Sequence, residues 1–375
     1  MLDAPTTVAP RILILTTDIG EGHDLPARQL AEGLAEERPG AEVTIADGLA
    51  AMGRLLSAAI KDQSRVIFKM PPWVWNIEHW LAIRFAPTTW LARTLSYALG
   101  HRGLLRLIRA HAPDVVVSTY PGTTMVLGML RARGKLHVPA VGAITDLAEL
   151  RYWAMPGVDV HLVTHEESIP EVRALAPARD VRWVRGLTSP GFTEPADPAV
   201  GRREFGLPDE SPVGVGSGVV FGVGDLGGAV RESLGITGAH VVILCGRNDE
   251  LRARMEDAFG AEPRVHVSGF TDKMSALFAA ADVLIHSTAG LTVLEAWIRG
   301  CRVVSYGWGV AHIRANNVAF VEHDIARVAL TRAQLATALQ EALAEPRLER
   351  HDTFAALQTA ASAVLEELPA GRATR

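Results

Sequence analysis

Short β-branched runs alternate with helical patterns along almost the whole chain, and this alternation restricts the fold more than any other feature. RILILT (11–16) and DVLIHS (282–287) are typical runs, and apolar residues recur at helical spacing over 27–34. Such alternation is typical of βαβ units, in which helices cover both faces of a parallel sheet. The sequence therefore predicts an α/β protein. The predicted strands are residues 11–16, 42–47, 114–119, 139–145, 159–164, 181–186, 212–218, 240–246, 264–269, 282–287, 302–307 and 326–330.

A proline-rich stretch near residues 188–200 separates two such series. The chain has 375 residues, which is more than one hydrophobic core usually serves. We therefore expect two doubly wound domains with a ligand cleft between them. The expected divisions are an N-terminal domain over 1–190, a C-terminal domain over 191–345, and a helix with a tail over 346–375.

Composition excludes several classes of protein. The net charge of −5 and the isoelectric point near 6.2 give no general basic field, so a dedicated nucleic-acid binder is disfavoured. Two cysteines, Cys245 and Cys301, exclude a disulfide scaffold or a four-cysteine zinc site, and both are expected to be buried. The first residues lack a signal-peptide pattern and no long apolar run is uninterrupted, so we expect a cytoplasmic chain without a membrane span.

Charge is unevenly distributed along the chain. Residues 51–110 contain nine basic and two acidic side chains, a local balance of +7, which leaves −12 for the remainder. The same window contains four tryptophans. Indole rings and cations on amphipathic helices suit the headgroup layer of an anionic membrane, so we predict peripheral attachment through 61–95. The alternative is that these rings pack against the sheet while the cations face water. The four tryptophans are Trp73, Trp75, Trp80 and Trp90.

Two glycine-containing loops follow predicted strands. GEGH places Gly22 and His23 in a tight turn that leads into a helix, where an imidazole suits general-base chemistry; the alternative is a histidine that only caps the turn. The spacing is not that of the dinucleotide fingerprint, so NAD is not expected. The second loop, over 216–224, suits a phosphate or is simply a glycine-rich turn.

The segment after residue 264 is the most informative. A predicted strand ends at Ser287, a turn with Gly290 opens a helix, and Glu295 lies about one turn further on. Backbone donors and the helix dipole there suit a diphosphate, and the carboxylate lies within reach of ribose hydroxyls. This arrangement is typical of nucleotide-sugar binding.

These motifs together resemble a known family. GEGH, TDLAELRYW, CGRN and the text from GFTDKM to AGLTVLEA are similar to the family 28 group of GT-B glycosyltransferases. The likeness covers roughly residues 11–330 and is greatest to the monogalactosyl- and glucosyldiacylglycerol synthases, with the enzyme that glycosylates lipid I more distant. It implies two Rossmann-like domains, a UDP-sugar in the second and a lipid acceptor in the first. It also implies inversion at the anomeric carbon without a cofactor or bound metal, at the inner face of the cell membrane.

The resemblance assigns donor residues. Phe270 would contact uracil through its backbone, Glu295 would bind ribose, and His312 and Asn316 would face the donor sugar. The diphosphate would be held by Gly218, Ser287, Thr288, Ala289, Gly290, Leu291 and Thr292.

The resemblance also assigns the acceptor side. His23 would contact or deprotonate the acceptor hydroxyl, and Asp146 would orient it or act as the base itself. Gly22 and the four tryptophans Trp73, Trp75, Trp80 and Trp90 would contact the acceptor or the membrane.

The sequence departs from the family pattern in two places. Leu150 stands where the family usually has histidine, and GVAHIRAN replaces a loop that usually carries glutamine and acidic residues. The donor sugar and the acceptor are therefore open. Three alternatives remain: a glycosyltransferase for a soluble natural product such as a polyketide, a UDP-sugar 2-epimerase, and an inactive protein that binds lipid surfaces.

Overall fold

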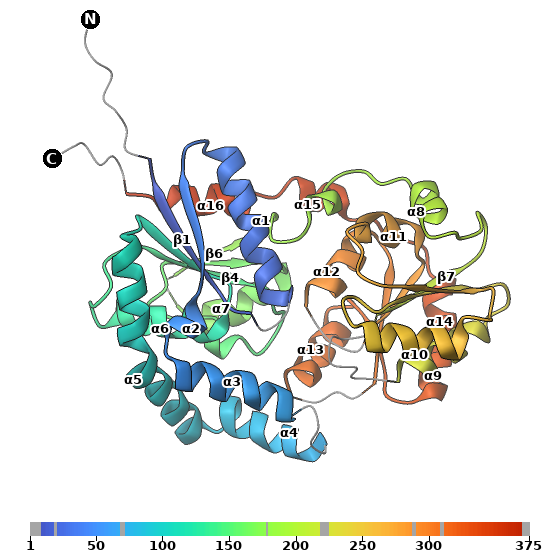
Figure 1. The fold of residues 1–375 in the computed structure, drawn as a ribbon, viewed down its shortest axis with the longest axis horizontal. Coiled ribbons are helices and arrows are strands. Elements are labelled where there is room, and N and C mark those ends of the chain that lie inside the picture. Colours follow the sequence, from blue (N-terminus) through green and yellow to red (C-terminus); the bar gives the residue numbers. More distant parts are fainter. Residues whose placement is uncertain are drawn as a thin grey trace, which may run out of the picture.

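The computed structural model describes residues 9–18, 21–67, 72–177, 179–217, 225–286, 290–307 and 311–369. Within these ranges twelve strands form two sheets of six, and every strand pair is parallel (Figure 1). Each predicted strand begins within one residue of its predicted start. The predicted α/β class with two doubly wound sheets is therefore confirmed.

The first sheet has the strand order β2-β1-β3-β4-β5-β6. Its central strands are buried on both faces, which is why they read as uninterrupted apolar runs. Apolar clusters lie on either side, one beneath α1 and one beneath α5 and α6. The strands are β1 (Arg11–Thr16), β2 (Glu42–Asp47), β3 (Val115–Ser118), β4 (Ala140–Ile144), β5 (Val160–Val163) and β6 (Asp180–Trp183).

The helices of the first half connect these strands. Three of them, α3, α4 and α5, follow one another below the sheet in the view of Figure 1. They are α1 (Glu21–Glu37), α2 (Gly48–Ala51), α3 (Arg54–Ile67), α4 (Pro72–His79), the π-helix η1 (Trp80–Arg84), α5 (Ala86–His111), α6 (Pro121–Ala132), the short η2 (Leu150–Tyr152) and η3 (Glu166–Ser168), α7 (Ile169–Leu175) and η4 (Pro190–Phe192).

The second sheet has the order β12-β11-β10-β7-β8-β9. Its strands are β7 (Val213–Ser217), β8 (His240–Leu244), β9 (Val265–Ser268), β10 (Val283–His286), β11 (Arg302–Tyr306) and β12 (Arg327–Ala329). The accompanying helices are α8 (Pro198–Glu204), α9 (Leu226–Leu234), α10 (Asp249–Phe259), α11 (Met274–Ala280), α12 (Leu291–Ile298), α13 (Ala311–Glu322) and α14 (Arg332–Ala344).

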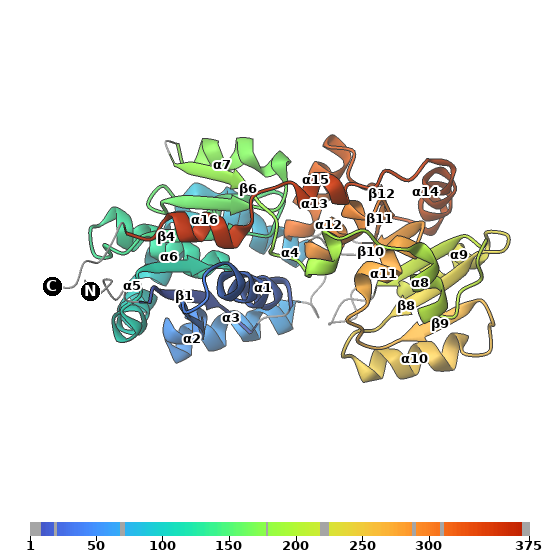
Figure 2. The same ribbon diagram turned by 90° about the horizontal axis from the view of Figure 1, so that it is seen from above.

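The C-terminal segment returns from the second domain to the first. Helix α15 (His351–Ala355) lies beside the second domain and α16 (Ala360–Glu366) lies along the first (Figures 1 and 2). Ala360 and Val364 belong to the same buried cluster as Leu30 of α1. Phe354 of α15 packs between Trp183 of β6 and Trp297 of α12, with ring centroids 5.5 and 5.9 Å away. These aromatic contacts join the two domains.

Candidate functional site

The candidate site lies where the two sheets present their carboxyl ends. Helix α1 follows β1 and α12 follows β10, and in open parallel sheets ligands bind beyond these strand ends. Figure 1 shows α12 and α13 on the side of the second domain that faces the first. One buried apolar cluster contains Leu147 and Leu291, and Leu25 of α1 packs against it. The first turn of α1, which carries His23, and the loop with Asp146 are thereby held near the start of α12.

The ring of His23, in the first turn of α1, is held by the segment that follows β3. Its Nδ1 lies 3.0 Å from the Thr119 carbonyl oxygen, which only accepts hydrogen bonds, so Nδ1 donates. The neutral ring therefore carries its lone pair on Nε2. The hydroxyl groups of Thr16 and Thr119 donate to the His23 carbonyl oxygen at 3.0 and 2.9 Å. The ring also meets Tyr120 edge to face, with centroids 5.2 Å apart. This tautomer suits a general base that uses Nε2.

Asp146 is linked to His23 through Trp153, which contacts both side chains. The Trp153 indole N–H donates to Asp146 Oδ2 at 2.8 Å, and the Trp153 ring centroid lies 5.9 Å from that of His23. Trp153 itself is buried. A second link joins the two loops, because the Thr145 hydroxyl donates to the Gly22 carbonyl oxygen at 3.5 Å. The structure thus brings the two proposed acceptor residues to one side chain, Trp153.

The loop after β4 is also tied to the tryptophan-rich segment. Glu149 accepts hydrogen bonds from His79 of α4 and from Arg84 of η1, and the Tyr152 hydroxyl donates to the Ala82 carbonyl oxygen at 2.8 Å. Burial alone would raise the pKa of Glu149, but the hydrogen bonds and charges of His79 and Arg84 lower it below its ordinary value. Its backbone has φ of 58°, a left-handed conformation that costs free energy for a non-glycine residue.

On the donor side, α12 begins after Gly290, which has φ of 110° and so uses glycine's conformational freedom. The first N–H groups of any helix, here those of Leu291 and Thr292, lack intrahelical acceptors. Glu295 lies one turn later and is only 6% exposed. No other described residue forms a hydrogen bond with its carboxyl group, and burial raises its pKa to about 8. A buried carboxyl without donors is costly, so this group is suited to a ligand that supplies hydroxyl donors.

The other predicted donor residues are only partly described. Phe270 follows β9 and is exposed, with the Arg247 guanidinium 4.2 Å from its ring centroid. Asn316 is buried within α13. His312 belongs to α13, but its side chain lies outside what the structure describes, as do the residues Gly218, Ser287, Thr288 and Ala289. The donor assignments remain predictions.

An apolar surface covers the helices below the first sheet. We call it the aromatic face and define it by these exposed residues: Leu55, Trp73, Ile77, Trp80, Leu81, Phe85, Trp90, Leu91, Leu95 and Leu99. Trp73 is 64% and Trp90 67% exposed, and the rings of Trp80 and Phe85 stack at 5.0 Å. A hollow of about 360 Å³ between Trp73, Ile77 and Leu81 lies in this face. Sequence reasoning missed the leucines of α5, although their spacing of four marks one helical face.

The prediction that Trp75 also faces the membrane is wrong. Trp75 is 7% exposed and lies in the protein interior. At 100° per residue it projects about 200° away from Trp73 on α4, so only one of the two rings can face outward. The alternative that the aromatics pack inward therefore holds for Trp75, whereas Trp73, Trp80 and Trp90 are exposed as the membrane prediction requires.

The described residues contain neither a metal-ligand cluster nor a membrane-spanning helix. No group of three or more histidine, cysteine, aspartate or glutamate side chains is arranged there to hold a metal ion. None of the described helices combines the length and the apolar character that crossing a bilayer requires. Both cysteines are buried as predicted, and burial raises the pKa of Cys301 to about 12.

Comparison with known proteins extends these observations. Residues 23–176 match the family model for monogalactosyldiacylglycerol (MGDG) synthase, and residues 222–345 match the model for glycosyl transferases group 1. The two models cover the candidate acceptor and donor halves respectively. The predicted resemblance to the diacylglycerol glycosyltransferase group is confirmed.

Individual relatives are distant. A processive diacylglycerol beta-glucosyltransferase of Staphylococcus saprophyticus is 25% identical over 235 residues, which is 62% of this chain and 60% of that protein. Monogalactosyldiacylglycerol synthase 1 of Arabidopsis thaliana is 28% identical over 249 residues, or 63% of this chain and 45% of that protein. The matched region thus spans less than two thirds of either relative. The crystal structure of Acinetobacter baumannii MurG has a TM-score of 0.59 at 16% identity, covering 96% of this chain and 99% of that one, which supports the GT-B fold.

Proposed function

We propose that this chain, with its GT-B fold and its likeness to diacylglycerol glycosyltransferases, transfers a hexose from a UDP-sugar to a lipid acceptor at a membrane surface. The acceptor would be of the diacylglycerol type, and the anomeric carbon would be inverted. Support comes from family models that match both halves of the chain and from the names of its relatives.

The buried carboxyl of Glu295 is the observation that carries the donor half of the proposal. Its lack of a hydrogen-bond partner among the described residues leaves two oxygens that a ribose diol would satisfy. The helix α12 begins one turn earlier, so its first N–H groups and its dipole would face the diphosphate of the same nucleotide. A nucleoside diphosphate sugar carries both a ribose diol and a diphosphate.

On the acceptor side, His23 would act as the general base. The acceptor hydroxyl would lose its proton to Nε2 as its oxygen attacks C1 of the sugar from the face opposite the nucleotide. The bond between C1 and the diphosphate oxygen would break, and that oxygen would leave with the electron pair. The N–H groups of Leu291 and Thr292 would stabilise the developing charge without a metal ion. Asp146 would position His23 through Trp153.

The aromatic face supports a lipid acceptor and peripheral attachment. Monomeric soluble proteins rarely expose this many large apolar side chains on one group of helices without a function for them. Arg84, Arg102 and Arg106 lie beside the exposed tryptophans and leucines in the chain and are themselves exposed, which suits an anionic bilayer such as the inner face of a cell membrane. Contacts from Glu149 and Tyr152 connect this surface to the loop that contains Asp146.

The test is UDP release across a panel of UDP-sugars with three acceptor classes: diacylglycerol in vesicles, polyprenyl phosphates and soluble aglycones. We expect turnover with diacylglycerol, and Glu295→Gln should chiefly raise the KM for the donor. Turnover with soluble aglycones alone would favour a natural-product glycosyltransferase. Conversion of the UDP-sugar without any acceptor would identify an epimerase. Vesicle binding with no UDP release under any condition would leave only a lipid-binding protein.

A further inference from the structure

His165 lies in the contact between the two domains. It stands between β5 and η3 of the first domain, and the residue is buried, with 2% of its surface exposed. The centroid of its ring lies 6.3 Å from that of Trp297, which belongs to α12 of the second domain. The Trp297 ring in turn meets the Phe354 ring at 5.9 Å and the Arg350 guanidinium at 4.2 Å. The His165 ring is thus a contact of the first domain with the second.

This contact connects the two halves of the candidate site. Trp297 belongs to α12, the helix whose first turn is the proposed diphosphate site. On the side of the first domain, the Ser168 hydroxyl of η3 donates to the Leu147 carbonyl oxygen at 2.9 Å. Leu147 directly follows Asp146. A change in the His165 contact would therefore move the donor helix α12 relative to the acceptor loop.

Two short segments of the chain cross between the domains. Leu187 belongs to the buried cluster beneath α1 and Phe192 to the cluster of the second domain, so residues 188–191 join them. On the return, residues 355–359 join Phe354 in the second cluster to Ala360 in the first. Segments this short can act as hinges, and relative motion is the default expectation for domains joined in this way. Noncovalent contacts such as that of His165 therefore decide the relative orientation of the domains.

The groups that face His165 do not favour a positive charge on it. Its Nδ1 lies 4.0 Å from Glu167 Oε2, beyond hydrogen-bond distance, and neither atom has a hydrogen-bond partner among the described residues. The Arg350 guanidinium interacts with Glu167 and offsets its negative charge. The indole of Trp297 is neutral. Burial, together with the positive charge that His323 after α13 can carry, lowers the pKa of His165 to about 4.

We propose that His165 is a positioning residue that holds the two domains in this arrangement while its ring is neutral and releases them when the ring takes up a proton. A protonated ring in this contact would be a buried cation without a hydrogen-bonded counter-ion, which is costly. Rotation of the second domain about the two crossing segments would expose the ring to water, which solvates the charge. The proposal concerns only the arrangement of the domains, so it does not depend on the transfer reaction proposed above.

The sign and size of the effect follow from proton linkage. An exposed histidine ring titrates near pH 6.5, whereas the pKa of His165 in the contact is about 4. The released form therefore binds a proton that the contact form does not, and the contact is at full strength above pH 6.5. Below that pH its equilibrium constant falls about tenfold per pH unit, until about pH 4. From pH 7.5 to 5 the expected change is about thirtyfold.

The test measures the distance between the domains in the full chain by pulsed electron paramagnetic resonance. Spin labels are attached to Ala35→Cys of α1 and Ala258→Cys of α10, which are exposed positions in different domains. The native cysteines, Cys245 and Cys301, are buried and should not take the label. We expect one main distance at pH 7.5 and a second population at pH 5, with the ratio of the second to the first raised about thirtyfold.

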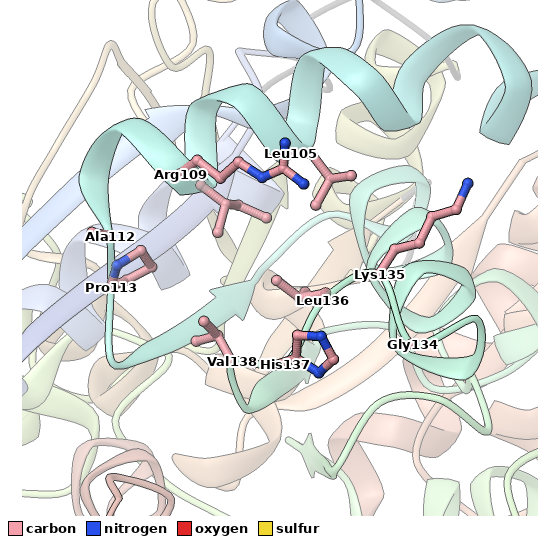
Figure 3. Close-up of a pocket in the computed structure, with 10 residues that line it drawn as sticks. Leu105, Arg109, Ala112, Pro113, Gly134, Lys135, Leu136, His137 and Val138 are labelled. Atoms are coloured by element: carbon pink, nitrogen blue, oxygen red, sulfur yellow. The ribbon is translucent and has the colours of Figure 1, made fainter.

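Four variants identify the group that is responsible. H165Q and H165F do not titrate, and H165F keeps an aromatic ring against Trp297, so both should give the pH 7.5 distribution at pH 5 as well. H161Q removes another buried histidine whose pKa is about 4, but His161 accepts a hydrogen bond from the Met155 N–H within the first domain. H137Q removes an exposed histidine beside the pocket of about 700 Å³ between α5 and the loop after α6 (Figure 3). Both controls should respond to pH as the wild type does.

Three results would overturn the proposal. The first is a wild-type distance distribution that is the same at pH 7.5 and 5. The second is a pH response that persists in H165Q and H165F, because another group would then control it. The third is loss of the response in H161Q or H137Q, because the effect would then not be specific to this contact. None of these measurements needs UDP or turnover, so they remain decisive if the proposed transfer reaction fails.

Discussion

Replacing Glu295 with glutamine tests the buried carboxyl directly. Burial raises the pKa of Glu295 to about 8 in the folded protein, whereas an unperturbed glutamate side chain in water has a pKa of 4.5. Between these values the folded state holds a proton that the unfolded state has released, so the free energy of unfolding falls as pH rises. The slope is about 1.4 kcal/mol per pH unit, and the loss from pH 4.5 to 8 is on the order of 5 kcal/mol. Glutamine has nearly the same shape and does not titrate here.

The assay is urea unfolding of both proteins from pH 5 to 8.5, followed by tryptophan fluorescence. Other groups titrate too, and burial lowers the pKa of the histidines His161, His165 and His286 to about 4, which changes stability in the opposite direction. These groups are present in both proteins, so the difference in the free energy of unfolding between wild type and E295Q isolates the effect of Glu295. We expect E295Q to gain stability relative to the wild type as pH rises. A difference independent of pH would refute the assignment of a buried, titrating carboxyl.

The same variant links the carboxyl to the nucleotide. Ribose hydroxyls donating to Glu295 favour its ionised form, so the wild-type affinity for UDP should rise from pH 6 to 8. E295Q lacks this titrating carboxyl and should show no such rise. At pH 8 it should bind UDP about tenfold to a hundredfold more weakly than the wild type, because a charge-assisted hydrogen bond is worth about 1.5–3 kcal/mol. Equal UDP affinity of the two proteins would contradict the proposal that Glu295 binds ribose, but it would not contradict the burial of its carboxyl group.

Four further predictions concern other parts of the chain. His23→Ala should lower turnover by about 10² to 10⁴ while UDP affinity is unchanged, and near-normal turnover would reject the base. Trp73→Ala should weaken vesicle binding at least tenfold without loss of stability, whereas Trp75→Ala should lower the free energy of unfolding by about 3–5 kcal/mol, as for other buried aromatics. Phe354→Ala should cost a similar amount in urea unfolding; a change below 1 kcal/mol would mean that the interdomain aromatic contacts contribute little. Glu149→Gln should lower turnover about tenfold or more with vesicle binding unchanged, and a normal rate would show that its contacts do not position the catalytic loop.

The strands were predictable because buried parallel strands are apolar along their whole length. Each run stands out between glycine, proline and polar residues, and all twelve starts are correct to within one residue. The return of α16 to the first domain was not predictable. The sequence predicts only a helix and a tail over 346–375, because the packing of Ala361 against α1 is a contact across more than 300 residues. Local spacing does not encode such a contact.

The sequence predicts where the main residues of the candidate site lie in the fold, but not how their side chains are placed. His23 and Glu295 follow strand ends, so their positions follow from the fold, and both lie at the carboxyl edges of their sheets. The ring placement of His23 depends on Thr119, about 100 residues away, and no local motif indicates it. The prediction for Trp75 is wrong because the number of tryptophans in a window does not show which side of the helix each one occupies. The helical period would have separated Trp75 from Trp73.

The position of Glu149 explains how one loop can serve both chemistry and attachment. Asp146 and Trp153 enclose a short turn, and Glu149 in that turn holds His79 and Arg84 of the tryptophan-rich segment. The left-handed backbone of Glu149 costs free energy, which the two charged partners offset. If α4 rests on a bilayer, these contacts fix the height of Trp153, and with it the His23 ring, above the membrane surface. A lipid hydroxyl lies at a defined depth in that surface. A base held at a fixed distance from it therefore needs no separate acceptor pocket for the acyl chains.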